Sequence, residues 1–156
     1  MKNKILVING PNLDILGKRE IDIYGNISLD EINLKMQKLS DDSSFDIEFY
    51  QSNIEGELID KINTMDTSYK ALIINPAAYT HTSLALFDSL NNLDILKIEV
   101  HISNIYKREE FRKKSLTAGA CDSVLSGFGV SGYFLALEFI IGKKWLIKNS
   151  KIILSN

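Results

Sequence analysis

The 156-residue sequence predicts a three-layer α/β/α sandwich built on a five-stranded parallel sheet, and three observations support this fold. Short runs rich in β-branched residues alternate with segments of helical periodicity, which is typical of βα units. Several of these runs are apolar along most of their length, as parallel strands covered on both faces are. With 45% hydrophobic and 24% charged residues, the chain can bury a core of this size without disulfides or a metal.

The expected strands are short and are separated by segments of helical periodicity. They cover Lys4–Asn9, Phe45–Tyr50, Lys70–Asn75, Ile95–Ile102 and Asp122–Ser126. With right-handed crossovers, five strands fit an open sheet of order 2-1-3-4-5, which is flavodoxin-like, better than a closed barrel that needs eight. No repeat, low-complexity tract or linker divides the sequence, so we take residues 1–156 as one domain.

Helices are expected in the connections between these strands. They cover residues 28–39, 55–65 and 83–90, and a last helix runs from about residue 130 toward Trp145. The first opens with a capping box made by Ser28 and Glu31. The last carries Phe134, Leu137 and Ile141 at helical spacing. Residues 143–156 form a basic, then apolar tail to which we assign no structure.

Charge balance and cysteine content restrict the function classes. Eighteen Lys and Arg against 20 Asp and Glu give a net charge of −2, which argues against a general nucleic-acid binder. Cys121 alone cannot form an internal disulfide or a Cys-rich zinc site, so a reducing compartment, the cytoplasm, is favoured. The apolar run Ile5–Ile8 is too short for a signal peptide or a membrane span, and we expect no membrane association.

Polar side chains gather just after four of the expected strands, where an open parallel sheet binds its ligands. The clusters are Asn9–Asn12, Gln51–Asn53, Asn75–Ser83 and Glu99–Asn104. Both histidines of the chain, His81 and His101, fall in these clusters, in a loop or at a strand end rather than on an apolar face. Because two histidines without a third ligand at a recognisable spacing make a weak zinc site, we expect no metal.

Glu99 and His101 form the sharpest catalytic candidate. They are two residues apart on one strand, so their side chains leave the same face and can pair. Such a carboxylate fixes the imidazole tautomer and favours its protonated form, which suits a general acid. The alternative is a surface Glu beside a His that has no catalytic role.

The connection between the first strand and the first helix is about 16 residues long, whereas roughly 4–6 is usual. Gly17 and Gly25 would let it hinge as a lid and carry Arg19 and Tyr24 onto a substrate. A free tyrosine is only about 0.1% ionised at pH 7, and an adjacent guanidinium could stabilise the tyrosinate. Without such a partner, Tyr24 would be a packing residue of the loop.

Two other motifs have simpler explanations. Gly127–Gly132 reads G-x-G-x-x-G between a strand and a helix, but too little chain follows for the acidic residue of a dinucleotide site. Tight turning and close helix–sheet packing explain its glycines better. The charged run Arg108–Lys114 is typical of a solvated helix face, from which one arginine could point inward. A nucleotide or flavin binder of flavodoxin-like fold and a noncatalytic scaffold therefore stay open as alternatives.

Six blocks of the sequence together resemble the type II 3-dehydroquinate dehydratases, small enzymes of the shikimate pathway. The blocks are Ile8–Leu13, Gly17–Glu20 with Tyr24-Gly25, Gln51–Asn53 with Glu55–Glu57, Asn75-Pro76 with Tyr79–Ser83, Glu99–Asn104, and Arg108-Glu109 with Phe111-Arg112. Their order, spacing and chemistry agree along almost the whole chain. The resemblance implies a single catalytic domain that eliminates water in trans from 3-dehydroquinate, through an enolate, to give 3-dehydroshikimate without metal or organic cofactor.

The resemblance also implies the roles of the catalytic residues. Tyr24 would be the base that takes the proton next to the ketone, and Arg19 would stabilise the tyrosinate. Asn12 would help to hold the enolate. His101 would protonate the departing hydroxyl, and Glu99 would orient His101.

Substrate contacts and assembly follow from the same resemblance. The contact positions are Asn75, His81, Ile102, Ser103 and Arg112, with Asp88 reaching the site across a subunit boundary. The boundary implies a homo-oligomer, a dodecamer built from four trimers. Departures from the family pattern lie beside these positions: Ile21 replaces the usual Pro, Ala77 a Gly, Ile54 a His and Leu116 a Tyr. They affect the lid and subunit packing more than the reaction.

Overall fold

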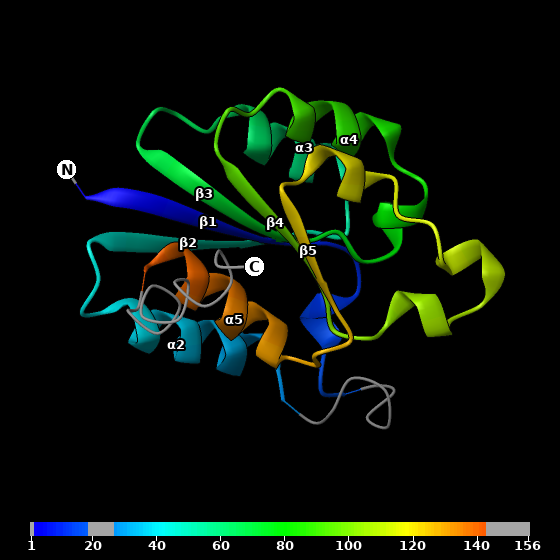
Figure 1. Cartoon of the computed structure of the whole chain (residues 1–156), viewed down its shortest axis with the longest axis horizontal. Helices are drawn as coiled ribbons and strands as arrows, with labels where there is room; N and C mark the ends of the chain where they lie inside the picture. The colour runs from blue at the N-terminus through cyan, green and yellow to red at the C-terminus, as the bar shows by residue number, and fades with distance from the viewer. Residues whose placement is uncertain (1, 19–26, 143–156) are drawn as a thin grey trace, which may run out of the picture.

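The structure is a computed structural model that describes residues 2–18 and 27–142, and within these residues it contains one parallel sheet (Figure 1). The strands lie in the order β2-β1-β3-β4-β5. Their bounds are β1 Asn3–Asn9, β2 Phe45–Gln51, β3 Tyr69–Asn75, β4 Leu96–His101 and β5 Ser123–Ser126. Every neighbouring pair is parallel, so the predicted fold class and strand order are confirmed.

Helices cover both faces of the sheet, as Figure 1 shows. They are α2 Leu29–Ser40, α3 Glu55–Asn63, α4 Leu84–Asn91 and α5 Ser131–Ile140. Ile5 and Val7 of β1 pack into the core beneath α2 and α5, whereas Leu6 and Ile8 pack into the core beneath α3 and α4. Because successive strand residues point to opposite faces, a central strand must be apolar throughout. Each fully buried side chain of this kind contributes about 1.5–3 kcal/mol.

The ends of two helices show how the sequence sets their bounds. The expected capping box is present at α2, where the Glu31 amide donates to Ser28 Oγ and the Ser28 amide donates to Glu31 Oε2. The last helix is shorter than predicted, because α5 ends at Ile140 and Gly142 takes the left-handed φ of 64° that commonly ends helices. Trp145, toward which this helix was expected to run, lies outside the described residues.

The loops that follow the paired strands β1 and β3 pack closely against each other. The Gly10 amide donates to the Asn75 carbonyl at 2.8 Å. A Cβ on Gly10 would lie 2.4 Å from the carbonyl oxygen of Pro76, so only glycine lets the two loops pass each other. This edge of the sheet is where the polar clusters of the sequence meet. In the part of the chain that the structure describes, no helix is long and apolar enough to span a membrane.

Candidate active site

A cavity of about 230 Å³ lies at the carboxyl edge of the sheet. Its walls come from the loops that follow β1, β3 and β4, as expected for an open parallel sheet. Six residues predicted from the sequence line it: Asn12, Asn75, His81, Ile102, Ser103 and Arg112. The volume suits a small metabolite rather than a dinucleotide, because drug-sized ligands occupy pockets of roughly 300–1,000 Å³.

The Asn12 loop is held by the polar end of β2. Asn12 has a left-handed φ of 66°, which Asn tolerates better than most residues, and its amide donates to Asn53 Oδ1 at 2.7 Å. Gln51 Nε2 donates to the same oxygen at 3.2 Å, and Tyr79 Oη donates to the Asn53 carbonyl at 2.8 Å. Asn53 thus fixes the loop that presents Asn12 to the cavity, a role that the sequence alone did not assign.

Glu99 and His101 form the predicted pair at the end of β4. His101 Nε2 lies 2.6 Å from Glu99 Oε1. Glu99 is 0% exposed and His101 5% exposed, so the histidine is far more buried than its place at a strand end predicted. Because a carboxylate only accepts, Nε2 carries the proton of this hydrogen bond, and Nδ1 is the ring nitrogen left to exchange a proton with a ligand.

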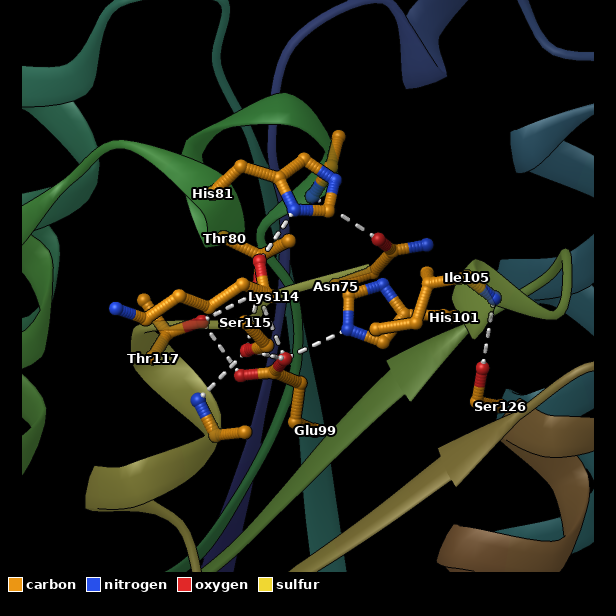
Figure 2. A network of polar contacts seen from close by, with 12 residues as sticks. Asn75, Thr80, His81, Glu99, His101, Ile105, Lys114, Ser115, Thr117 and Ser126 are labelled. Atoms are coloured by element: carbon orange, nitrogen blue, oxygen red, sulfur yellow. Dashed lines mark hydrogen bonds and ion pairs between the residues drawn. The ribbon is translucent and has the colours of Figure 1, made fainter. Parts of the chain in front are cut away.

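Three hydroxyls surround the Glu99 carboxylate (Figure 2). Thr80 Oγ1 and Ser115 Oγ donate to Oε1 at 2.8 and 2.9 Å, and Thr117 Oγ1 donates to Oε2 at 2.6 Å. Burial is the largest influence on the Glu99 pKa and raises it. Hydrogen bonds from His101, Thr117 and Thr80, with the charge of His101, outweigh burial and hold this pKa below the ordinary 4.5. Glu99 therefore remains a carboxylate at neutral pH.

His81 is oriented by a backbone carbonyl on the wall of the cavity. Its Nδ1 lies 2.7 Å from the Lys114 carbonyl oxygen (Figure 2). The carbonyl can only accept, so Nδ1 carries a proton. In the neutral ring, Nε2 then remains as a hydrogen-bond acceptor. The two histidines therefore differ in what they offer a ligand.

Two arginines, not one, reach the cavity from the charged run after β4. Arg108 and Arg112 both line it. Arg112 Nη1 lies 2.8 Å from Glu109 Oε1, and Arg108 Nη1 donates to Ser103 Oγ at 3.3 Å. Fixed guanidinium groups bind carboxylates well. The sequence did not predict Arg108 as a site residue, because its position within the charged run is also typical of a solvated surface residue.

The structure does not bring every predicted residue to the cavity. Glu99 and His101 are not among the residues that line it, although Ile102, next to His101, is. Arg19 and Tyr24, predicted as the lid cation and the base, lie outside the described residues. Asp88 is exposed on α4 and does not line the cavity, so its contact across a subunit boundary stays a prediction. Leu16, three residues before Arg19, does line the cavity.

Backbone hydrogen bonds within the protein use amides of the glycine motif Gly127–Gly132. Gly127 donates to the His101 carbonyl at 3.1 Å, and Gly129 donates to the Ile102 carbonyl at 3.0 Å. A Cβ on Gly132 would lie 3.1 Å from Val100 Cγ1. Amides that would hold a pyrophosphate are thus already used, so nucleotide or flavin binding is not favoured. Across residues 2–18 and 27–142, no cluster of three or more His, Cys, Asp and Glu could hold a metal ion.

These features define an acid–base enzyme of flavodoxin-like fold that acts on a small anionic molecule. A buried carboxylate holds an imidazole at the end of β4, and Ile102, the residue after that imidazole, lines a cavity that offers guanidinium and amide donors. Comparison with known proteins then identifies the family. The family described as Dehydroquinase class II matches residues 3–141, and this chain belongs to it.

Individual relatives agree in sequence and in structure. The chain is 53% identical over 151 residues to the 3-dehydroquinate dehydratase of Clostridium botulinum strain Langeland, covering 97% of this chain and 98% of that one. The crystal structure of type II dehydroquinase from Butyrivibrio crossotus superposes with a TM-score of 0.86 at 44% identity, over 89% of this chain and 97% of that one. That from Propionibacterium acnes gives 0.86 at 37% identity, over 92% and 99%. The resemblance recognised in the six sequence blocks is confirmed.

Proposed function

We propose that this chain is a type II 3-dehydroquinate dehydratase, a hydro-lyase that converts 3-dehydroquinate into 3-dehydroshikimate and water in the shikimate pathway. The Glu99–His101 pair beside the cavity is the observation that carries the proposal. Removal of a proton next to a ketone needs a base, the resulting enolate needs hydrogen-bond donors, and the hydroxyl needs an acid to leave.

His101 is the proposed acid. With Nε2 held by the Glu99 carboxylate at 2.6 Å, the ring is oriented so that Nδ1–H can protonate the departing hydroxyl. The C–O bond breaks with its electron pair on oxygen, and the proton from Nδ1 completes the water molecule. Glu99 keeps the ring in place and stays ionised throughout the step.

Tyr24 is the proposed base, acting as a tyrosinate beside Arg19. A drop of two units in a tyrosine pKa needs about 2.7 kcal/mol of differential interaction, which a partly desolvated arginine can supply. The position of Leu16 on the cavity wall supports this proposal. Arg19 follows Leu16 by three residues, so even an extended chain places it within about 10 Å of Leu16. A base on this segment and an acid on β4 can address opposite faces of one ring, which is what a trans elimination needs.

Substrate binding uses both walls of the cavity. We assign the substrate carboxylate to Arg112 and the backbone amides of Ile102 and Ser103, which donate no hydrogen bond within the described residues. Asn75 and His81 bind hydroxyl groups of the ring. Asn12 donates toward the enolate oxygen, where negative charge develops.

We further propose a dodecamer of four trimers in the cytoplasm. Asp88 is exposed on α4, four residues from Leu84, whose side chain is 65% exposed, so this helix has an apolar and an acidic group available to a second copy. Multi-angle light scattering on the purified chain tests the assembly: a mass twelve times that of one chain supports it, and a monomer contradicts it.

To test the activity, purified protein is mixed with 3-dehydroquinate in the presence of EDTA, and the absorbance of the conjugated enone product is followed over time. We expect turnover that EDTA does not change. Tyr24→Phe and Arg19→Ala should lower kcat strongly while substrate still binds. An effect of Arg19→Ala on KM alone would contradict the tyrosinate role, and no turnover by the wild type would overturn the function itself.

A further inference from the structure

Tyr133 connects the ends of two strands beneath the cavity. Asn9 and Asn75 are register partners at the ends of β1 and β3, and both point toward α5. Tyr133 of α5 is 0% exposed, and its hydroxyl lies between them. Tyr133 Oη is 2.6 Å from Asn9 Oδ1 and 2.8 Å from Asn75 Nδ2.

The direction of these hydrogen bonds is set by a backbone group. The Ala77 amide, which can only donate, lies 3.1 Å from Asn75 Oδ1. The Asn75 carbonyl therefore faces Ala77, and its amino group must donate to Tyr133 Oη. The Tyr133 hydroxyl then has to give its own proton to Asn9 Oδ1. Burial raises the pKa of Tyr133, so the hydroxyl keeps this proton at any working pH.

Stability alone does not explain this arrangement. Asn9 Nδ2 is buried and has no hydrogen-bond partner among the described residues. A buried donor left unpaired costs about 1–3 kcal/mol, and apolar side chains in place of Asn9 and Tyr133 would remove this cost while leaving one Asn75 N–H without its partner. The polar groups do one thing that apolar groups cannot: they hold the amide of Asn75, which lines the cavity.

We propose that Tyr133 is a positioning residue that locks the Asn75 amide so that its remaining N–H is offered to the cavity, where it binds an oxygen atom of the substrate that accepts a hydrogen bond. In the view of Figure 2, the Asn75 side chain lies between the rings of His81 and His101. This inference rests on the proposed function, because the dehydration reaction reports it.

Tyr133→Phe tests the proposal, because it keeps the ring and removes only the hydroxyl. Without the Tyr133 hydroxyl, the Ala77 amide alone holds the Asn75 side chain, and the weaker positioning costs binding in the ground state and the transition state alike. We expect KM for 3-dehydroquinate to rise about 3- to 10-fold while kcat stays within about twofold. In an Asn75→Ala background, Tyr133→Phe should change KM by less than about twofold, since its target is gone.

Two further variants separate positioning from stability. Tyr69, at the start of β3, is another buried tyrosine, and its hydroxyl donates to Glu48 of β2. Tyr69→Phe should lower stability without changing KM. The double variant Asn9→Leu/Tyr133→Phe removes both partners, so we expect it to regain stability while KM stays raised. An unchanged KM in Tyr133→Phe, or a KM restored in the double variant, would overturn the proposal. A wild-type chain without turnover would instead overturn the proposed function, and this inference with it.

Discussion

Replacing Thr117 by valine tests how the hydroxyls around Glu99 support the acid. Thr117 is 0% exposed and donates to Glu99 Oε2 at 2.6 Å, and valine has nearly the same shape without the hydroxyl. A hydrogen bond to a charged group is worth about 1.5–3 kcal/mol. We expect Thr117→Val to lower the free energy of unfolding by about this amount at pH 7, because Thr117 stabilises the ionised carboxylate.

The pH dependence of this loss is the sharper part of the prediction. Because the folded state lowers the Glu99 pKa, the stability it contributes is present above 4.5 and is lost as pH falls through the lower folded value. The penalty of Thr117→Val should therefore be largest at neutral pH and shrink in acid. The acid limb of the kcat/KM profile should move to higher pH, since the carboxylate becomes easier to protonate.

Urea unfolding at several pH values, with kcat/KM over the same range, measures both effects. Ser40→Ala is the matched control, because Ser40 is also buried but donates to the uncharged Gln37 carbonyl at 2.8 Å. It should cost about 0.5–1.5 kcal/mol at every pH and leave the activity profile unchanged. A penalty for Thr117→Val that does not vary with pH, together with an unmoved acid limb, would refute the reasoning.

Three further substitutions test the walls of the cavity and the loop contact beside it. Ala77 has a left-handed φ of 51°, which explains why glycine is usual there. Ala77→Gly should therefore raise the free energy of unfolding, measured with urea, by about 1 kcal/mol. A lower urea midpoint would contradict the strain at Ala77. Gly10→Ala should lower the free energy of unfolding by about 2 kcal/mol or more, because the Cβ of the alanine meets the Pro76 carbonyl. Wild-type stability in this variant would show that the two loops can separate. Arg112→Ala should raise KM for 3-dehydroquinate about 10-fold or more, and an unchanged KM would remove Arg112 from the carboxylate site.

The sheet and the Glu99–His101 pair could be predicted because their signals are local. Strand order follows from apolar runs alternating with helical segments, and the pair follows from the two-residue period of one strand. The last helix is shorter than predicted because one residue, Gly142, turns left-handed and ends it, while the apolar pattern continues past that point.

The surroundings of the site could not be predicted, because residues distant in sequence build them. Thr80, Ser115 and Thr117 approach Glu99 from segments outside β4, and isolated hydroxyl residues have no periodicity to reveal them. Tyr133 lies 124 residues from Asn9, and a buried aromatic on an apolar helix is read as core. His101 is buried as well, although a local pattern placed it at an open strand end.

A crystal structure of the assembled protein with a nonreactive analogue of 3-dehydroquinate tests the central claim most directly. The account predicts that the ring lies in the cavity between two groups on its opposite faces, the Tyr24 hydroxyl and His101 Nδ1. Each should lie about 2.6–3.2 Å from the position it protonates or deprotonates, directly or through one water. An analogue bound elsewhere, or a Tyr24 too distant from His101 for both to reach one six-membered ring, would contradict the account.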